Sequence, residues 1–163
     1  MFRNILLSII IALFVFCTSN NDIQVIGHRG AMGHALENTL ESVKKAIALK
    51  ADGIEIDVFK TKSGDLVVYH DSILSRLSNS NAFIEEISLD SIKKIHLING
   101  SLIPTLNEVI DIIPNNIFLN IELKGRNTAY KTNETILQYI NQKNLKIDKF
   151  IISSFRWDEL EKF

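Results

Sequence analysis

Hydrophobic positions follow two spacings along the chain after residue 22. Short β-branched runs alternate with longer segments in which apolar side chains recur every three or four residues. This alternation predicts an α/β fold with strands joined by helices. The expected strands are residues 23–27, 53–59, 66–70, 117–123 and 150–154, and the expected helices are residues 88–98, 104–113, 133–143 and 157–163. A further helix is expected to begin at Asn38, capped together with Glu41.

The segment between the second and third expected strands is too short to hold a crossover helix. The 66–70 strand is therefore expected to return antiparallel, as a hairpin around Ser63 and Gly64. A two-residue turn at this point places Asp57 directly opposite His70 across the hairpin. A slip of one residue would break that pairing.

Residues 1–19 form a separate segment. Arg3 precedes an almost unbroken apolar run over residues 5–17, and small or polar residues follow. This pattern is typical of a signal peptide cleaved after Ser19, and the run is shorter than the roughly 20 residues that cross a bilayer. An uncleaved anchor, or lipidation of Cys17, is the alternative. The interpretation predicts an exported protein, periplasmic or extracellular, with membrane contact only through this segment.

Composition and charge narrow the class of protein. The chain has 163 residues, 46% of them hydrophobic and 23% charged, which is an ordinary globular profile. The formal net charge is -1, and the basic residues are spread along the chain. Because nothing provides the basic field that holds a phosphate backbone, nucleic acid is not an expected partner.

Two of the expected strands carry carboxylates within apolar sequence. Strand periodicity places Glu55 and Asp57 on one face of the second strand, and Glu122 on the polar face of the fourth. Buried carboxylates cost several kcal/mol each unless a counter-charge is present. One divalent cation, Mg²⁺ or Ca²⁺, would suit oxygen ligands. Neutralisation by Arg29 and Lys124 in a structural network is an equal alternative from spacing alone.

Histidines stand at two strand ends, where α/β sheets and barrels place their chemistry. His28 follows the first strand, and His70 closes the third. Imidazole is the side chain best suited to exchange protons near neutrality, so these two can act as base and acid across a phosphodiester. His34, in a turn, and His96, within an expected helix, are assigned structural roles.

A glycine-rich turn surrounds the first of these histidines. Gly27, Gly30 and Gly33 allow the backbone to approach a ligand or to adopt positive φ. Arg29 lies between them, and its planar fork of donors suits two phosphate oxygens at once. The turn predicts a phosphate contact.

The motifs together resemble the glycerophosphodiester phosphodiesterase family. They are GHRGAMGHALENT at residues 27–39, GIEIDVFKTKSGDLVVYHD at 53–71, IPTL at 103–106, NIELK at 120–124 and SSF at 153–155. Their order makes the combination highly specific, and the resemblance covers essentially everything after residue 22. One departure is Leu36, where the family usually has proline before Glu-Asn-Thr.

The resemblance implies a phosphoric diester hydrolase on a TIM-type (β/α) barrel of the phospholipase C-like phosphodiesterase kind. It implies roles for seven residues: Glu55, Asp57 and Glu122 as metal ligands, His28 and His70 as the acid/base pair, and Arg29 and Lys124 as phosphate contacts. The implied cofactor is one divalent cation, Mg²⁺ or Ca²⁺. The implied substrate is a small glycerophosphodiester, hydrolysed to glycerol 3-phosphate and an alcohol such as choline or ethanolamine.

The length predicts an incomplete barrel. A closed eight-stranded barrel takes about 250 residues, whereas residues 20–163 contain only about five expected strands, the N-terminal portion of such a domain. Two alternatives to the hydrolysis of small glycerophosphodiesters stay open. In the first, the chain is an inactive relic or a module that binds metal and phosphate. In the second, it is a related barrel phospholipase that acts on membrane lipid.

Overall fold

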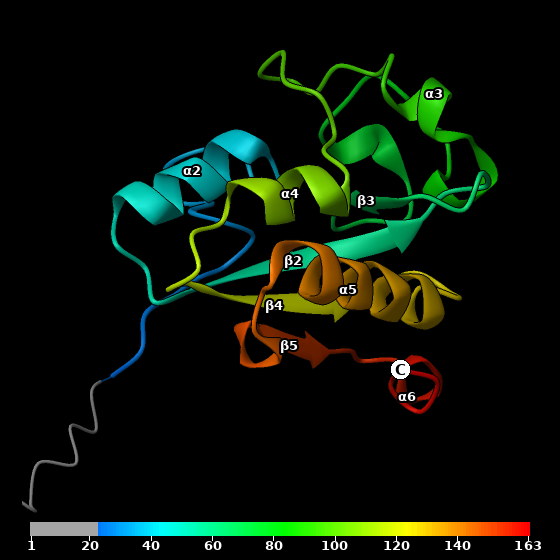
Figure 1. The fold of residues 1–163 in the computed structure, drawn as a ribbon. Coiled ribbons are helices and arrows are strands. Elements are labelled where there is room, and N and C mark those ends of the chain that lie inside the picture. Colours follow the sequence, from blue (N-terminus) through cyan, green and yellow to red (C-terminus); the bar gives the residue numbers. More distant parts are fainter. Residues whose placement is uncertain (1–22) are drawn as a thin grey trace, which may run out of the picture.

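A computed structural model describes residues 23–163, in which helices pack on a mostly parallel sheet (Figure 1). The predictions for residues 1–19, including signal cleavage and lipidation of Cys17, lie outside the described residues. None of the helices within residues 23–163 has both the length and the hydropathy needed to cross a bilayer.

Strands and helices follow the predicted order. The strands are β1 (Ile26–Gly27), β2 (Gly53–Lys60), β3 (Leu66–Val68), β4 (Phe118–Leu123) and β5 (Phe150–Ser153). The helices are α2 (Leu40–Ala48), α3 (Leu89–Ile92), α4 (Leu106–Ile112), α5 (Ala129–Lys143) and α6 (Trp157–Leu160), with 3-10 turns at Leu74–Arg76, Ile84–Glu86 and Ile147–Lys149. The α/β prediction is confirmed.

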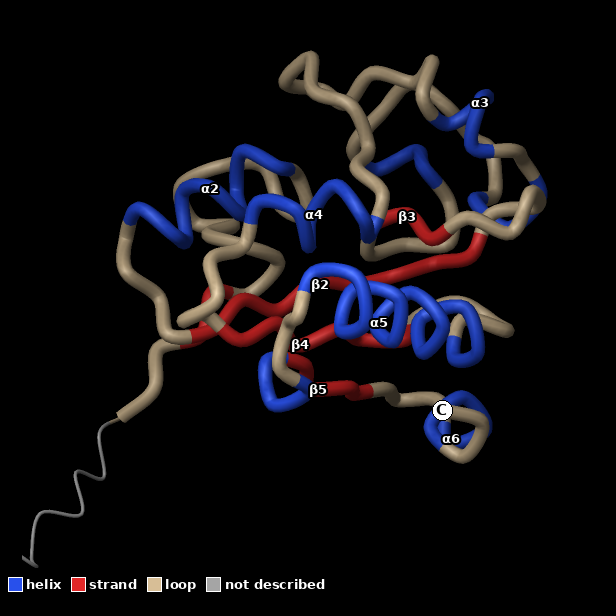
Figure 2. Tube along the Cα trace, viewed as in Figure 1, coloured by secondary structure: helices blue, strands red, loops and turns tan. Residues whose placement is uncertain are grey.

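The sheet has the strand order β1-β2-β4-β5, with all neighbours parallel, and β3 pairs antiparallel with β2. Helices α2, α4 and α5 run back between successive parallel strands, and the segment that contains α3 lies beyond β3 (Figures 1 and 2). All four parallel strands therefore end at the same edge of the sheet, which is where such folds place their chemistry.

Apolar side chains of the two central strands fill the core beneath the helices. Ile54, Ile56 and Val58 of β2 are fully buried, as are Leu119 and Ile121 of β4. Their alternation with polar residues on β4 matches the predicted faces. A second cluster, under the segment beyond β3, includes Phe59, Tyr69, Leu74, Ile84 and Ile92. The two clusters hold β2 from both sides.

The predicted hairpin register is wrong by one residue. Val58 pairs with Val68, and Lys60 pairs with Leu66, so Asp57 faces Tyr69 rather than His70. The loop has three residues instead of two, because the Thr61 carbonyl accepts from the Gly64 N–H at 3.0 Å and Gly64 has φ +94°. A turn followed by a left-handed glycine is the usual form of a three-residue hairpin loop.

The start of α2 and the end of α3 differ from prediction, because nearby groups bond to residues distant in sequence. α2 is capped by Thr39 with Ser42, not by Asn38 with Glu41, because the Asn38 side chain is bonded to Asp57. The helix expected over 88–98 is shorter, α3, because the Ile98 N–H donates to the Leu77 carbonyl. The capping box of α4 is confirmed.

Candidate active site

The two central strands bring three carboxylates together. In the β2–β4 register Asp57 pairs with Glu122, and Glu55 pairs with Asn120. Paired residues of parallel strands project to the same face of the sheet. One carboxylate oxygen from each of Glu55, Asp57 and Glu122 lies within 4.8 Å of the other two. The acidic residues that the sequence placed at one site do meet there.

Glu55 and Asp57 are buried, Glu122 is partly buried, and hydrogen bonds satisfy these carboxylates only in part. Burial is the main cause that raises the pKa of Glu55 to about 7, with the charges of Asp57 and Glu122 adding to it. Burial also raises the pKa of Asp57. Within residues 23–163, the buried Glu55 Oε1 has no hydrogen-bond partner, and the buried Glu122 Oε1 meets only the Lys124 ammonium, 3.2 Å away. Since an unpaired buried oxygen is costly, this donor set fits a hard divalent cation.

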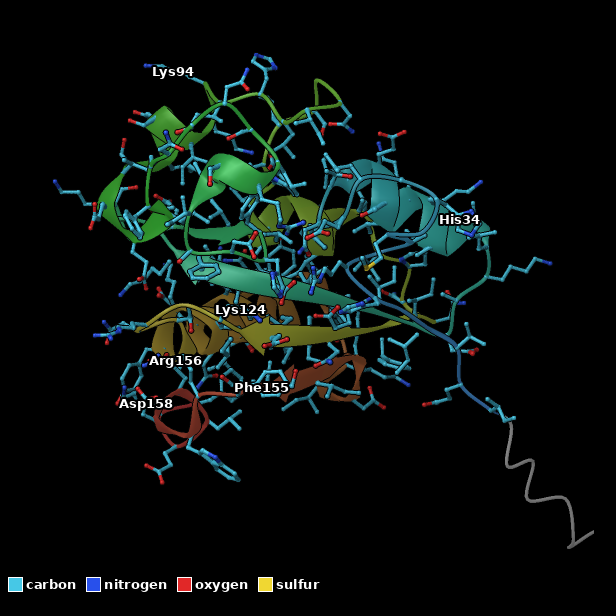
Figure 3. All side chains as sticks on the ribbon, turned by 180° about the vertical axis from the view of Figure 1, so that it is seen from behind. His34, Lys94, Lys124, Phe155, Arg156 and Asp158 are labelled. Carbon is cyan, nitrogen blue, oxygen red and sulfur yellow. The ribbon has the colours of Figure 1, made fainter. Side chains whose placement is uncertain are left out.

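Two basic side chains balance part of the negative charge. Arg29 Nε lies 3.5 Å from Asp57 Oδ2, and Lys124 Nζ lies 3.2 Å from Glu122 Oε1 and 3.8 Å from Asp57 Oδ1. Lys124 also stands 5.9 Å from the centre of the Phe155 ring, and the two residues are adjacent in Figure 3. The neutralising network considered from the sequence therefore exists. This network contains two positively charged side chains and three carboxylates.

The loop after β1 is held against β2 at Glu55. The Arg29 N–H donates to Glu55 Oε2 at 2.8 Å, and the Gly30 N–H donates to the Glu55 carbonyl at 3.1 Å. Arg29 is in the left-handed region, with φ +51°. Gly30 also has positive φ, and a Cβ there would lie 2.3 Å from Ser42 Oγ. The glycine is therefore required for this loop to pass α2, and the loop directs Arg29 at the acids.

Both predicted catalytic histidines lie beside the acidic cluster. His28 Nε2 is 3.8 Å from Glu55 Oε2, and its side chain is largely exposed. His70 Nδ1 is 2.6 Å from Asp71 Oδ1, and His70 Nε2 is 3.2 Å from Lys124 Nζ. His70 comes close to the acids although the register prediction was wrong, because β3 ends at Val68 and the chain turns there.

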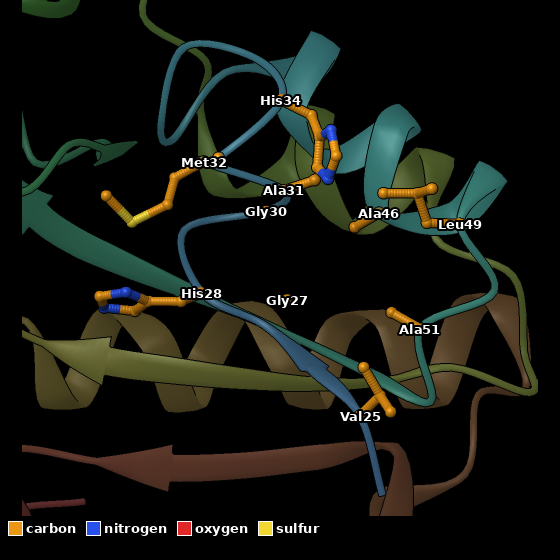
Figure 4. A pocket seen from close by; sticks show the side chains of 11 residues that line it. Val25, Gly27, His28, Gly30, Ala31, Met32, His34, Ala46, Leu49 and Ala51 are labelled. Carbon is orange, nitrogen blue, oxygen red and sulfur yellow. The ribbon is translucent and has the colours of Figure 1, made fainter.

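The histidines assigned structural roles lie elsewhere. His34 is in a turn, as predicted, and lines an apolar pocket of about 320 Å³ between the β1 loop and α2 (Figure 4). The His28 side chain borders the same pocket but extends along β2, away from Ala51 (Figure 4). His96 forms a β-bridge with Leu102 instead of lying in a helix, and its Nδ1 is 3.2 Å from the Gly100 carbonyl oxygen.

Four further polar residues join the site. Asn38 Nδ2 donates to Asp57 Oδ2 at 2.8 Å, and Glu37, Asp71 and Arg76 form ion pairs around Arg29 and His70. The sequence prediction gave none of them a role in the site. Glu37, Asn38 and Asp71 fall inside the motifs that carry the family resemblance, so that signal was available. Arg76 lies outside those motifs.

Comparison with known proteins gives a consistent result. Residues 28–163 match the model of the glycerophosphoryl diester phosphodiesterase family. A glycerophosphodiester phosphodiesterase of Caldanaerobacter subterraneus is 40% identical over 140 residues, covering 80% of this chain and 57% of that protein. Another, of Bacillus subtilis, is 31% identical over 164 residues, covering 88% of this chain and 56% of the relative.

Solved structures show the same likeness. The Thermotoga maritima glycerophosphodiester phosphodiesterase superposes with a TM-score of 0.70 at 35% identity, covering 88% of this chain and 60% of that one. An Oleispira antarctica phosphodiesterase in complex with the product sn-glycerol-3-phosphate superposes with a TM-score of 0.73 at 30% identity, covering 86% and 60%. The chain thus spans about three fifths of the length of these relatives.

Proposed function

This chain belongs to the glycerophosphoryl diester phosphodiesterase family, and from that premise we propose that its site hydrolyses glycerophosphodiesters to glycerol 3-phosphate and an alcohol. The observation that carries the proposal is the convergence of Glu55, Asp57 and Glu122 with two imidazoles and two basic side chains at one edge of the sheet. The product named in the Oleispira antarctica structure supports this substrate class.

In this proposal the basic side chains bind the phosphate. Arg29 and Lys124 already contact the acidic cluster from two sides, at 3.5 Å and 3.2 Å. A phosphate group between them would accept hydrogen bonds from the Arg29 guanidinium and from the Lys124 ammonium. Lys124 also donates toward His70 Nε2, so the bound phosphate would lie within reach of that imidazole.

The histidines move the protons. One imidazole takes a proton from the attacking group while the other gives a proton to the departing alkoxide oxygen, as acid/base catalysis of phosphodiester cleavage requires. The exposure of His28 leaves its Nε2 free to reach a substrate. Asp71 fixes one side of His70, which leaves Nε2 directed at Lys124 and the site.

Glu55, Asp57 and Glu122 would hold one divalent cation, Mg²⁺ or Ca²⁺, in this proposal. Among the described residues, Glu55 Oε1 has no hydrogen-bond partner, and the pKa values of Glu55 and Asp57 are raised. Both observations support the proposal, because burial opposes the charged forms that a cation would stabilise. When bound, such an ion supplies Lewis acidity at a phosphate oxygen and lowers the pKa of an attacking hydroxyl.

The first test is hydrolysis by the purified chain. Glycerophosphocholine and phospholipid vesicles are each incubated with the protein, with and without a chelator, and released glycerol 3-phosphate and headgroup are measured. We expect glycerophosphocholine to be hydrolysed, the chelator to stop the reaction, and Mg²⁺ or Ca²⁺ to restore it. Headgroup release from vesicles alone would support the phospholipase alternative. Inactivity on both would support the relic or binding module and contradict the proposal.

The second test concerns the imidazoles. His28→Ala and His70→Ala are each expected to lower turnover by at least about a hundredfold, the usual contribution of a positioned acid or base. Cation binding measured by titration calorimetry should persist, because neither histidine is among the three proposed ligands. His96→Ala is the matched control and should leave turnover unchanged, since the His96 side chain lies away from the site and hydrogen-bonds the Gly100 carbonyl. Full turnover in either site variant would remove the acid/base role.

A further inference from the structure

One arginine connects the part of the site that contains Arg29 with the part that contains His70. Arg76, at the end of the 3-10 turn after β3, contacts two carboxylates at once. Its Nη2 donates to Glu37 Oε1 at 2.6 Å and its Nη1 to Glu37 Oε2 at 3.1 Å, while its Nε donates to Asp71 Oδ2. Three of its five N–H donors are therefore used on two acids from different loops.

Glu37 connects Arg76 to Arg29, the proposed phosphate contact. Its Oε1 also accepts from Arg29 Nη1 at 3.0 Å, and the side chain is only 8% exposed. Burial alone would raise the pKa of Glu37, but hydrogen bonds from Arg76 and then Arg29 hold it below the ordinary value. The carboxylate stays charged and shared between the two guanidinium groups. It fixes the end of Arg29 that is not directed at Asp57.

Asp71 connects Arg76 to the imidazole of His70. Burial acts to raise its pKa, yet hydrogen bonds from Arg76 and His70 leave the pKa below the usual value. An ionised carboxylate only accepts hydrogen bonds, so at the 2.6 Å contact the His70 Nδ1–H must be the donor. His70 Nε2 is then the acceptor that faces the Lys124 ammonium at 3.2 Å. One tautomer follows from both contacts.

We propose that Arg76 is a positioning residue that sets the orientation of Arg29 through Glu37 and the tautomer of His70 through Asp71. The inference rests on the proposed function, since it assigns a role in organising that site. Arg76 touches neither the acidic cluster nor a reacting atom. It acts through the two carboxylates, and it links the segment after β3 to the loop after β1, 39 residues away along the chain.

A lysine cannot replace this arginine. The guanidinium makes a two-point contact with Glu37 and still donates from Nε to Asp71, whereas an ammonium is a single point of charge. Arg76→Lys therefore keeps the charge and most of the size but loses the bridge. A role in stability alone, or in long-range charge, predicts that lysine restores what alanine removes. The positioning role predicts that it does not.

The kinetic experiment measures glycerophosphocholine hydrolysis by the wild type and by Arg76→Ala and Arg76→Lys. We expect kcat/KM to fall by about 10–100-fold in both variants, as when a residue that orients a site residue is lost, with kcat falling and KM rising together. Added methylguanidinium should restore part of the activity of Arg76→Ala. Arg126→Ala is the control, because Arg126 is exposed and donates to Glu85 from its backbone N–H. Wild-type kinetics in either Arg76 variant would overturn the inference.

The second measurement does not depend on turnover. Long-range nitrogen–proton NMR of isotope-labelled histidine reports the tautomer of His70 at a pH where the ring is neutral. The wild type should show the Nδ1–H form, and Arg76→Ala and Arg76→Lys should show a mixture. An unchanged tautomer in a folded variant, or loss of the fold in both variants, would overturn the positioning role. A wild type that is inactive while its tautomer responds to Arg76 would contradict the proposed function alone.

Discussion

Glu55 is a residue in which burial and charge conflict directly. Its carboxylate is largely removed from water, and Asp57 and Glu122 add negative charge nearby. The Arg29 N–H stabilises one of its oxygens, while the other has no hydrogen-bond partner within residues 23–163. This unfavourable burial of a carboxylate occurs at a strand position that the β2–β4 register fixes. Such a cost within a central strand indicates a binding site better than it indicates a structural ion pair.

This residue predicts a pH dependence of stability for the cation-free protein. The pKa of Glu55 is about 7 in the folded state and about 4.5 in the unfolded chain. Because the folded state binds the proton more tightly, this contribution is complete below pH 4.5 and is lost as the pH rises through about 7. The free energy of unfolding should therefore fall by up to about 3 kcal/mol over this interval, relative to Glu55→Gln.

Urea denaturation in chelator at a series of pH values measures the difference between wild type and Glu55→Gln. Saturating Mg²⁺ or Ca²⁺ should stabilise the wild type more above pH 7 than at pH 4.5, since cation binding requires the deprotonated carboxylate. Parallel pH profiles for the two proteins, without added cation, would contradict the assigned shift.

At the scale of elements, the start of α5 shows how a helix end depends on distant residues. The sequence predicts the helix from Asn133, yet it begins at Ala129. Glu159 of α6, fully buried, accepts from the backbone N–H groups of Asn127, Thr128 and Ala129 at 2.8, 2.9 and 3.0 Å. Burial acts to raise the pKa of Glu159, but these donors lower it overall. A carboxylate from another helix thus satisfies donors that the local sequence leaves free.

Replacing this carboxylate should weaken the packing of α6 on α5. Glu159→Ala leaves three backbone donors without their acceptor, and the loss is expected to be about 2–3 kcal/mol in the free energy of unfolding. Glu134→Ala on the exposed side of α5, which removes only an ion pair with Lys131, is the control and should cost less than about 0.5 kcal/mol. Urea denaturation compares the two, and equal costs would refute the capping role.

On the scale of the whole molecule, the parallel part of the sheet within residues 23–163 ends at β1 on one side and at β5 on the other. β1 pairs only with β2, and β5 pairs only with β4. Ile151 on β5 is 46% exposed, and Phe155 and Trp157 just beyond it are exposed as well. A strand edge with exposed apolar side chains is a site for pairing with another chain. The relatives are longer than this chain, which spans about three fifths of their length.

This edge predicts concentration-dependent association of the purified chain. Light scattering coupled to size-exclusion chromatography should show larger species as concentration rises, and Ile151→Lys should shift them toward the monomer. Leu137→Lys is the matched control, because Leu137 is 48% exposed but belongs to the helix α5 and not to an outer strand. Equal effects of the two lysine substitutions would contradict association through β5.

Export of the protein, inferred from residues 1–19, remains a prediction.

Local patterns in the sequence determined much of this protein. The spacing of Ile54, Ile56 and Val58 against Glu55 and Asp57 predicted which face of β2 is buried in the core and which carries charge, because strand periodicity follows from backbone geometry alone. The order of strands and helices, and the capping box of α4, followed from similarly short-range rules. The motifs around the histidines and acids indicated the family.

Tertiary structure decided what depends on residues far apart in the chain. The start of α5 followed from Glu159, 30 residues away, and the linkage of Arg29 to His70 followed from Arg76, 39 residues from Glu37. Each is a hydrogen bond whose partner the local sequence does not specify, because several donors and acceptors nearby could equally satisfy it. Only the packed fold selects one partner, since burial makes every unpaired polar group costly.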